Sequence, residues 1–384
     1  MSQRVLISGY YGFNNMGDEA VLAGLLVGLR QVAPTVQPVA LSGCPAATSA
    51  MHGIESIPRF RMGAVWQALR RSAGLISGGG SLLQDVTSKR SVYYYLGVMA
   101  MARLAGRPFC ICGQGLGPLR SPLARRMTGR VLKQARSIWV RDHAAGEMVN
   151  TLLAGGEVQL YIAADPAFLL PPANEEQGRR ALEEAIGRKI GAIGPLWLVA
   201  MRPWQNEQRQ SYILQALVKA AKTADAGLVF VAMHPAHDQP PAEHLCREAR
   251  EQGVRSHVLV GSDVRQVCNL LAGADLVIAM RLHALILAVA AGVPGVAVSY
   301  DPKVTAFAQE LALPCLPLER LDAAGVAVLT RIILDTWTRQ AALRTHLQQA
   351  VADSRRRARQ ALACCIAGLG LPTASHGDVG DGQN

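Results

Sequence analysis

Residues 4–31 of the chain read RVLISGYYGFNNMGDEAVLAGLLVGLRQ. The apolar run at residues 4–9 predicts a strand, and leucines that recur at helical spacing predict a helix from about Gly17 to Gln31. A glycine-rich turn joins the two. The segment is therefore a strand–loop–helix unit, the repeating element of a parallel sheet covered by helices.

The same alternation runs through most of the 384 residues. It stops in a charged, glycine-rich region and then restarts, which predicts a second sheet. We therefore expect an α/β protein with two Rossmann-like domains that face a cleft, followed by a C-terminal helical segment. The strand candidates are residues 37–41, 74–77, 108–112, 137–140 and 159–162 in the first half, and 196–201, 227–233, 257–260, 276–280 and 295–299 in the second.

Composition places the domain boundaries. We predict an N-terminal domain over 1–172, a linker region over 173–194, and a C-terminal domain over 195–371 whose last part is helical from about Leu318 to Gly368. The final residues, 372–384, are polar and rich in glycine, and we expect them to be disordered.

The chain is basic, with 39 Lys and Arg against 28 Asp and Glu, a net charge of +11. Such a surplus favours anionic partners. Zinc-finger spacing, RNP-like strands and basic helices with interleaved aromatics are all missing, so nucleic acid is not the expected partner. The densest basic run contains Arg355, Arg356, Arg357 and Arg359. It is either a solvated helix face or a surface attracted to anionic lipid headgroups.

Eight cysteines are scattered without paired ligand spacing, which is typical of thiols in a reducing compartment. Cys110 and Cys112 alternate within a strand-like run, so we do not expect a metal there. The start of the chain has no signal-peptide order, and no apolar stretch reaches the roughly 20 residues of a spanning helix. A cytoplasmic protein is expected, with peripheral contact to the inner membrane face as an option.

The loop after the first strand, residues 9–20, contains Asn15, Asp18 and Glu19. Its glycines allow close approach of a ligand, and the helix start offers N–H groups to an anion. It lacks both the dinucleotide fingerprint and the P-loop lysine. Asp18 is a candidate general base. Alternatively, the two acids only complement the dipole of the helix N-terminus.

Two more glycine-rich segments follow strands of the first sheet. One holds Gly79, Gly80 and Ser81, and the other covers residues 113–118. Such turns can form anion-binding nests or let a substrate lie against backbone, or they can be turns without a ligand. Three such loops at one sheet edge favour a binding site.

Arg141 ends the next strand, and Asp165 follows the strand after it. The planar guanidinium of Arg141 could hold a carboxylate or a phosphate, or it could pair with Asp142 or another acid.

In the second half, Arg281, Leu282 and His283 begin a helix directly after a strand, and Lys303 follows the next strand. For His283 alone a structural role is the more common outcome, but two strand ends that deliver Arg, His and Lys together indicate an anion site. His234 follows another strand, with His237 and Asp238 nearby. A third ligand at metal-site spacing is missing, so we expect a phosphate or acceptor contact at His234 and no metal.

These motifs resemble, in order and spacing, the polysaccharide pyruvyl transferase family, and the resemblance extends from Gly9 to Lys303. The family is similar in fold to GT-B glycosyltransferases and takes phosphoenolpyruvate as donor. The opening loop resembles the branch that acts on N-acetylmannosamine in bacterial secondary cell-wall polymers, which anchor surface-layer proteins. This implies a lipid-linked saccharide acceptor and no cofactor.

By this resemblance, Asp18, Arg141, His283 and Lys303 match functional positions, and Arg281 matches a donor-binding arginine. Ketal formation needs a proton donor and a proton acceptor. We expect His283 as the acid and Asp18 as the base, with the reverse assignment open. Arg141, Arg281 and Lys303 would hold the anionic donor. The alternatives are a GT-B glycosyltransferase that uses a nucleotide sugar and a non-catalytic sugar-phosphate binding protein.

Overall fold

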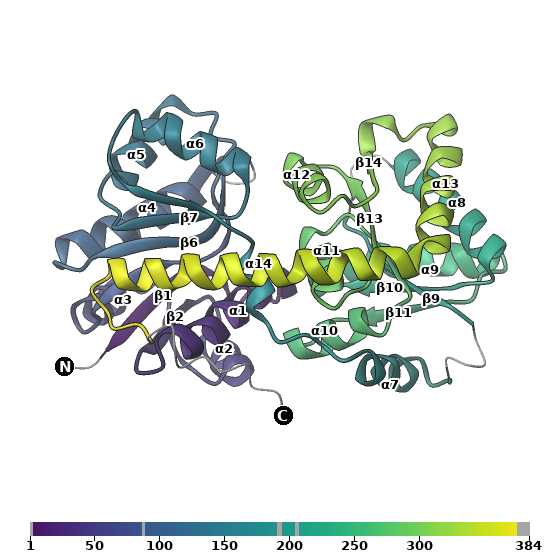
Figure 1. Ribbon diagram of the computed structural model, residues 1–384, viewed down its shortest axis with the longest axis horizontal. Coiled ribbons are helices and arrows are strands. Elements are labelled where there is room, and N and C mark those ends of the chain that lie inside the picture. The colour runs from purple at the N-terminus through teal and green to yellow at the C-terminus, as the bar shows by residue number, and fades with distance from the viewer. Residues whose placement is uncertain (1–2, 87–88, 190–193, 204–206, 375–384) are drawn as a thin grey trace. The chain divides into compact units, whose positions relative to one another are not determined.

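The structure, a computed structural model, describes residues 3–86, 89–189, 194–203 and 207–374 (Figure 1). The chain divides into two compact units. Unit 1 contains the chain up to Phe13, residues Asp18–Leu170 and the chain from Asp353 onward. Unit 2 contains Pro171–Ala352 and the short segment Asn14–Gly17.

Unit 1 is built on a parallel sheet with the strand order β3-β2-β1-β4-β6-β7-β8, and β5 also pairs with β6. Helices cover both faces of this sheet (Figure 1). One face packs against α3–α6, and the other against α1 and the end of α14. The strands are β1 (Arg4–Tyr11), β2 (Gln37–Ser42), β3 (Glu55–Pro58), β4 (Gly74–Ser77), β5 (Gly80–Leu83), β6 (Phe109–Leu116), β7 (Ser137–Val140) and β8 (Gln159–Ile162), and the helices are α1 (Met16–Val32), α2 (Pro45–His52), α3 (Met62–Arg70), α4 (Lys89–Leu104), α5 (Pro122–Leu132), α6 (His143–Leu153) and the 3-10 turn η1 (Pro166–Leu169).

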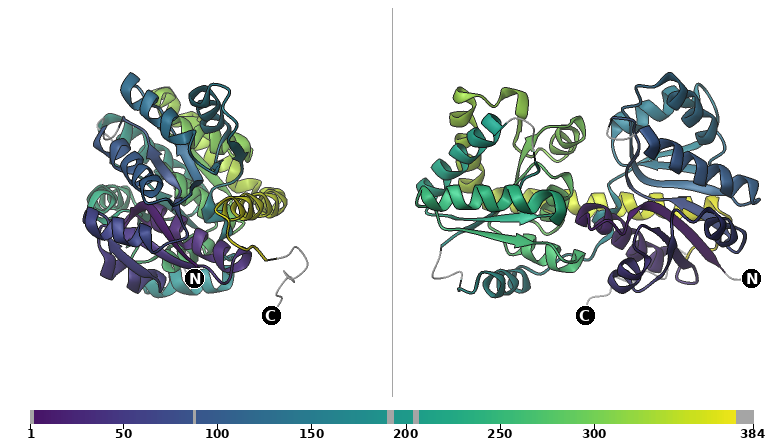
Figure 2. Two further views of the ribbon diagram at one scale, coloured as in Figure 1. Left: turned by 90° about the vertical axis from the view of Figure 1, so that its left-hand side faces the viewer. Right: turned by 180° about the vertical axis from the view of Figure 1, so that it is seen from behind.

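Unit 2 has a six-stranded parallel sheet in the order β11-β10-β9-β12-β13-β14, between helices on both faces (Figure 2). This is the doubly wound order of a Rossmann fold. Helices α8, α9 and α13 share one apolar core with the sheet. The elements are α7 (Glu175–Ile186), β9 (Leu196–Ala200), α8 (Glu207–Ala224), β10 (Gly227–Ala232), α9 (Pro235–Glu251), β11 (Ser256–Val260), α10 (Val264–Ala272), β12 (Leu276–Ala279), α11 (Leu282–Ala290), β13 (Gly295–Ser299), α12 (Pro302–Glu310), β14 (Cys315–Pro317), η3 (Leu318–Arg320), α13 (Ala323–Thr338) and α14 (Gln340–Gly368).

The strand interiors explain why both sheets form. Strands β4, β6, β9 and β10 are buried along their whole length, as expected where helices cover both faces of a parallel sheet. Both α/β sheets and the helical C-terminal segment that the sequence predicts are therefore confirmed.

The main segment of unit 1 ends at Leu170, close to the end predicted for the N-terminal domain, and unit 2 follows directly at Pro171. Most of the region expected as a linker forms α7, whose Gly178 lies against the backbone of Gly273 and whose Arg179 pairs with Asp275 at 2.8 Å. Its charged composition is that of an amphipathic helix on the surface of unit 2. Helix α14 runs 29 residues, and the part from Asp353 onward belongs to unit 1. The tail expected to be disordered lies, from residue 375 on, outside the described residues.

Two glycine-rich segments expected as loops are in part strands. Gly80–Leu83 forms β5, and β6 continues through Gly113 to Leu116, where it pairs with β5. The extra strand pairing satisfies the backbone groups that an anion-binding nest would have needed free. Among the described residues, no helix combines the length and the apolar character required to cross a bilayer.

Candidate functional site

The carboxyl edge of the sheet in unit 2 carries two arginines on neighbouring strands. Arg202 follows β9, and Arg281 follows β12, to which β9 pairs. The backbone N–H of Arg281 donates to the carbonyl of Ala200 at 3.3 Å, so the two strand ends are fixed together. In a doubly wound sheet the strand order reverses at this pair, which is where such folds bind ligands.

Arg281 is the N-cap residue of α11, and its charge is partly balanced. Its guanidinium makes a short ion pair with Asp238, a fully buried carboxylate in the first turn of α9. The other Asp238 oxygen accepts from the backbone N–H of His234 at 2.9 Å. Asp238 therefore holds in place two residues that were predicted to bind the donor or acceptor, Arg281 and His234. Its carboxylate pairs with an arginine.

His234 lies at the N-cap of α9 with its ring 4.4 Å from that of His237. Burial, with the nearby His237 and Arg281, lowers the pKa of His234 below its ordinary value of 6.5. Its Nδ1 is buried and has no hydrogen-bond partner within the described part of the chain. A neutral imidazole with an unused ring nitrogen is suited to an anionic or hydroxylated ligand.

The segment Asn14–Gly17 packs onto this sheet edge as part of unit 2. The N–H of Met16 donates to the carbonyl of Met233 at 2.9 Å. A Cβ atom built on Gly17 would lie only 2.4 Å from Nδ1 of His283, so a side chain at Gly17 would displace the ring. His283 is the second residue of α11. The predicted residues Asn15, His234, His283, Arg281 and Leu282 thus lie on segments that meet at one sheet edge.

Arg202 was not predicted as a site residue. Its guanidinium stacks over the ring of Tyr300, 4.6 Å from the centroid, and its Nε is buried without a hydrogen-bond partner among the described residues. No described carboxylate forms an ion pair with it. The signal was present in the sequence, since Arg202 follows a strand as directly as Arg281 does.

Lys303 lies in the first turn of α12, and its Nζ pairs with Asp301 at 3.1 Å. Both side chains are about one-third exposed. A pocket of about 420 Å³ opens beside this turn. It is lined by Ser299, Tyr300, Asp301, Pro302, Thr305, Ala306, Gln309 and Glu319.

In unit 1, Asp18 lies beside the glycine segment that was predicted with it. A Cβ on Gly80, which has φ +93°, would meet Oδ1 of Asp18 at 2.7 Å, so only glycine allows the carboxylate to approach here. Asp18 lies in the first turn of α1, which follows β1, and Gly80 begins β5, which follows β4. The order of this sheet reverses at the strand pair β1 and β4. Asp18 also contributes, after burial, to raising the pKa of the fully buried Tyr11 hydroxyl.

Glu19 has a structural role. One carboxylate oxygen accepts from the backbone N–H of Gly12 at 2.8 Å, and the other contacts Nε2 of His52 at 2.8 Å. The Glu19 side chain is 2% exposed. It therefore shapes the loop before α1, whereas its neighbour Asp18 is half-buried.

Arg141 is held by unit 1 itself. Its Nη1 pairs with Asp165 at 3.0 Å, and its Nη2 donates to Ser81 Oγ at 3.1 Å. The Arg141 side chain is 5% exposed. Arg141 was predicted either to hold an anionic ligand or to pair with an acid, and the geometry favours the pairing, here with Asp165. The same guanidinium links Asp165 to Ser81.

The fold of the chain is similar to that of several solved structures. A structure of a putative UDP-N-acetylglucosamine 2-epimerase from Listeria monocytogenes has a TM-score of 0.67 at 13% identity, covering 96% of this chain and 97% of that one. A structure of HepE from Anabaena in complex with UDP-glucose has a TM-score of 0.61 at 13% identity, covering 95% and 99%. The fold is accordingly of the GT-B class.

The sequence profile of the family described as polysaccharide pyruvyl transferase matches residues 15–302, and the chain belongs to that family. It is also 23% identical over 259 residues to the amylovoran biosynthesis protein AmsJ of Erwinia amylovora. That match covers 64% of this chain and 61% of AmsJ, so the chain spans about three fifths of the length of this relative.

Proposed function

We propose that this protein transfers the enolpyruvyl group of phosphoenolpyruvate onto a sugar of a cell-surface polysaccharide precursor, forms a cyclic pyruvyl ketal and releases phosphate. Membership of the pyruvyl transferase family supports the reaction class. The observation that carries the donor assignment is the placement of Arg202 and Arg281 on adjacent strand ends, with His283 two residues after Arg281.

The donor brings a carboxylate and a phosphate, so several cations are needed to hold it away from water. Arg281 and Lys303 each share their charge with an aspartate. Arg202 has no such partner in the described part of the chain, so it would add a positive charge to the donor site. In this proposal Arg202, Arg281, Lys303 and His234 bind the donor, and the backbone at Leu282 contributes an N–H from the start of α11.

The chemistry needs one proton placed on carbon and two removed from oxygen. His283 would protonate the methylene carbon of the donor, while a sugar hydroxyl attacks C2 and Asp18 accepts its proton. A second hydroxyl of the same sugar then attacks C2 as the bond to phosphate breaks, and its proton leaves with phosphate. Gly79, Gly80 and Ser81 would support the acceptor beside Asp18. Arg141 would position Ser81 and would not contact the donor directly.

For the acceptor we propose a lipid-linked saccharide with N-acetylmannosamine pyruvylated across its 4- and 6-hydroxyls. Contact with anionic lipid cannot involve the whole basic run, because Arg355 donates to the carbonyls of Phe168 and Leu170 at 3.1 and 3.3 Å. The exposed Arg356 remains for such a contact, although it pairs with Asp353. An Arg356→Glu variant should bind anionic vesicles less than wild type if lipid is involved, and bind them to the same extent as wild type if it is not.

The test is phosphate release from phosphoenolpyruvate by the purified full chain, with and without an N-acetylmannosaminyl-N-acetylglucosaminyl diphosphate lipid analogue, with mass spectrometry of the sugar. We expect acceptor-dependent phosphate and one ketal per sugar. His283→Asn and Asp18→Asn should each lower turnover by about 10²–10⁴ at saturating donor. Near-normal turnover in both would disprove these roles.

Structures of HepE from Anabaena contain UDP-glucose or UDP, which keeps a nucleotide-sugar transferase as the second candidate. It predicts that UDP-glucose alone raises the melting temperature through ligand linkage. Our proposal predicts this response to phosphoenolpyruvate instead. Stabilisation by phosphoenolpyruvate without phosphate release on any sugar would indicate a binding protein.

A further inference from the structure

Three cysteines that are distant in sequence bring their sulfur atoms together in unit 1. Cys110 and Cys112 lie on β6, and Cys365 lies near the end of α14. The Sγ atoms of Cys110 and Cys112 are 3.6 Å apart, and all three sulfurs lie within 4.8 Å of one another. All three side chains are fully buried.

Strand alternation and the course of α14 create this cluster. Ile111 faces the core formed with α3–α6, so Cys110 and Cys112 on either side of it face the opposite way. Helix α14 covers that second face, where Sγ of Cys365 lies 3.7 Å from the carbonyl oxygen of Ile111. Leu369, further along the chain, packs at Gly74 of β4, so the end of the helix is fixed on this sheet face beyond the cluster.

A single buried cysteine is ordinary core packing. Three converging sulfurs are different, because thiolates are the ligands that soft metal ions select. At a metal–sulfur distance of about 2.3 Å, three sulfurs around one ion would be roughly 3.8–4.0 Å apart. The observed spacing of 3.6 Å for one pair, with the others below 4.8 Å, is within reach of small side-chain rotations.

We propose that Cys110, Cys112 and Cys365 form a binding site for one soft, thiophilic metal ion, with Cu(I) as the favoured occupant. None of the described His, Cys, Asp and Glu side chains adds a fourth ligand to the group. Three sulfur ligands suit an ion that accepts three-coordination better than zinc, whose structural sites are tetrahedral with four ligands. Each thiol that binds gives up its proton. Occupancy would fasten α14 to β6 and stabilise unit 1. This site is separate from the residues assigned to pyruvyl transfer.

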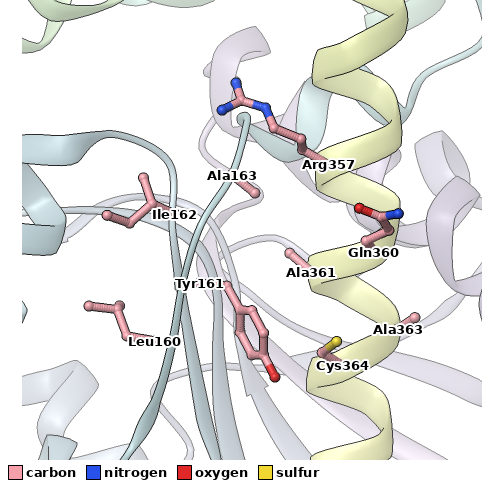
Figure 3. A pocket seen from close by; sticks show the side chains of 9 residues that line it. All are labelled: Leu160, Tyr161, Ile162, Ala163, Arg357, Gln360, Ala361, Ala363 and Cys364. Atoms are coloured by element: carbon pink, nitrogen blue, oxygen red, sulfur yellow. The ribbon is translucent and has the colours of Figure 1, made fainter.

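The next residue of the chain provides a matched control. Cys364 precedes Cys365 on α14 but lines a pocket of about 560 Å³, where Figure 3 shows it near Tyr161 of β8. Arg357 and Gln360 line the same pocket. Cys364 does not belong to the sulfur cluster, so Cys364→Ser changes a thiol on the same helix without touching the proposed ligands.

The experiment is an anaerobic titration of the reduced full chain with Cu(I) against a competing chelator. Wild type and Cys364→Ser should each bind one ion tightly and show a raised melting temperature, whereas Cys112→Ala and Cys365→Ala should lose both responses. Equal uptake by Cys365→Ala and wild type would overturn the site. Should the alanine variants unfold, X-ray absorption of copper-loaded wild type decides: three sulfurs at one distance support the proposal, and fewer than three overturn it.

Discussion

Gly17 lies against the ring of His283, close enough that a Cβ atom on Gly17 would stand 2.4 Å from Nδ1 and 2.9 Å from Cγ of the imidazole. Both residues belong to unit 2, and Asp18 is the next residue after Gly17 in the chain. Gly17 therefore limits the position of the His283 ring, and Asp18, the other proposed catalytic residue, is its neighbour in the chain.

Gly17→Ala should lower turnover because His283 must move to accommodate the methyl group. Gly97→Ala is the matched control, since Gly97 is also helical, is exposed, and has open space where its Cβ would be. Alanine there should stabilise the protein by about 0.5–1 kcal/mol. Turnover and thermal unfolding are measured for both. Full activity in Gly17→Ala would contradict the role of His283.

Two neighbouring acids should behave differently when neutralised. Glu19→Gln removes the charge that joins the Gly12 backbone to His52, and we expect a loss of about 1–3 kcal/mol in unfolding free energy. Asp18→Asn should leave stability nearly unchanged and impair turnover with normal donor binding. Denaturant unfolding and donor titration separate the two effects. The assignment fails if Asp18→Asn is the less stable variant and retains activity.

Arg202→Ala should weaken phosphoenolpyruvate binding by about tenfold to a hundredfold, the amount expected from losing a charge-assisted hydrogen bond. Arg202→Lys should recover only part of this, because lysine lacks the planar group that stacks over Tyr300. Arg255→Ala removes an exposed arginine paired with Asp225 and serves as control. Donor affinity is read by calorimetry. An unchanged affinity in Arg202→Ala would remove this residue from the donor site.

Acidification should destabilise unit 2 through two histidines. Burial is the main cause of the lowered pKa of both His234 and His257. Since the folded pKa lies below the ordinary 6.5, the unfolded chain binds more protons in the window just below that value, and stability falls as the pH drops through it. The double variant with glutamine at both positions should lose part of this slope between about pH 7 and 5.

The matched substitution for that experiment is His244→Gln, because His244 is exposed and pairs with Glu248 at the surface of α9. It should leave the pH dependence as in wild type. Unfolding midpoints are compared across the pH series. The same slope in the double variant and wild type would show that other groups control acid unfolding.

The alternation of apolar runs with helical segments determined both parallel sheets, because that pattern is local. The same local pattern predicted that five site residues follow strand ends, where ligands bind in parallel α/β sheets: Asp18, His234, Arg281, His283 and Lys303. It left the strands β3, β5 and β14 undetected, since each is short and none is a continuous apolar run of four residues or more. Arg202 was missed although its position after a strand gave the same signal.

Only the tertiary structure decided which charges are already balanced. Arg141 meets Asp165, 24 positions away, and Arg281 meets Asp238, 43 positions away, and no local pattern specifies such pairs. The placement of Gly17 against His283 and the convergence of Cys365 with β6 across 254 positions have the same origin. Periodicity predicts the direction in which a side chain leaves its own element, whereas the packing of distant elements determines what that side chain meets.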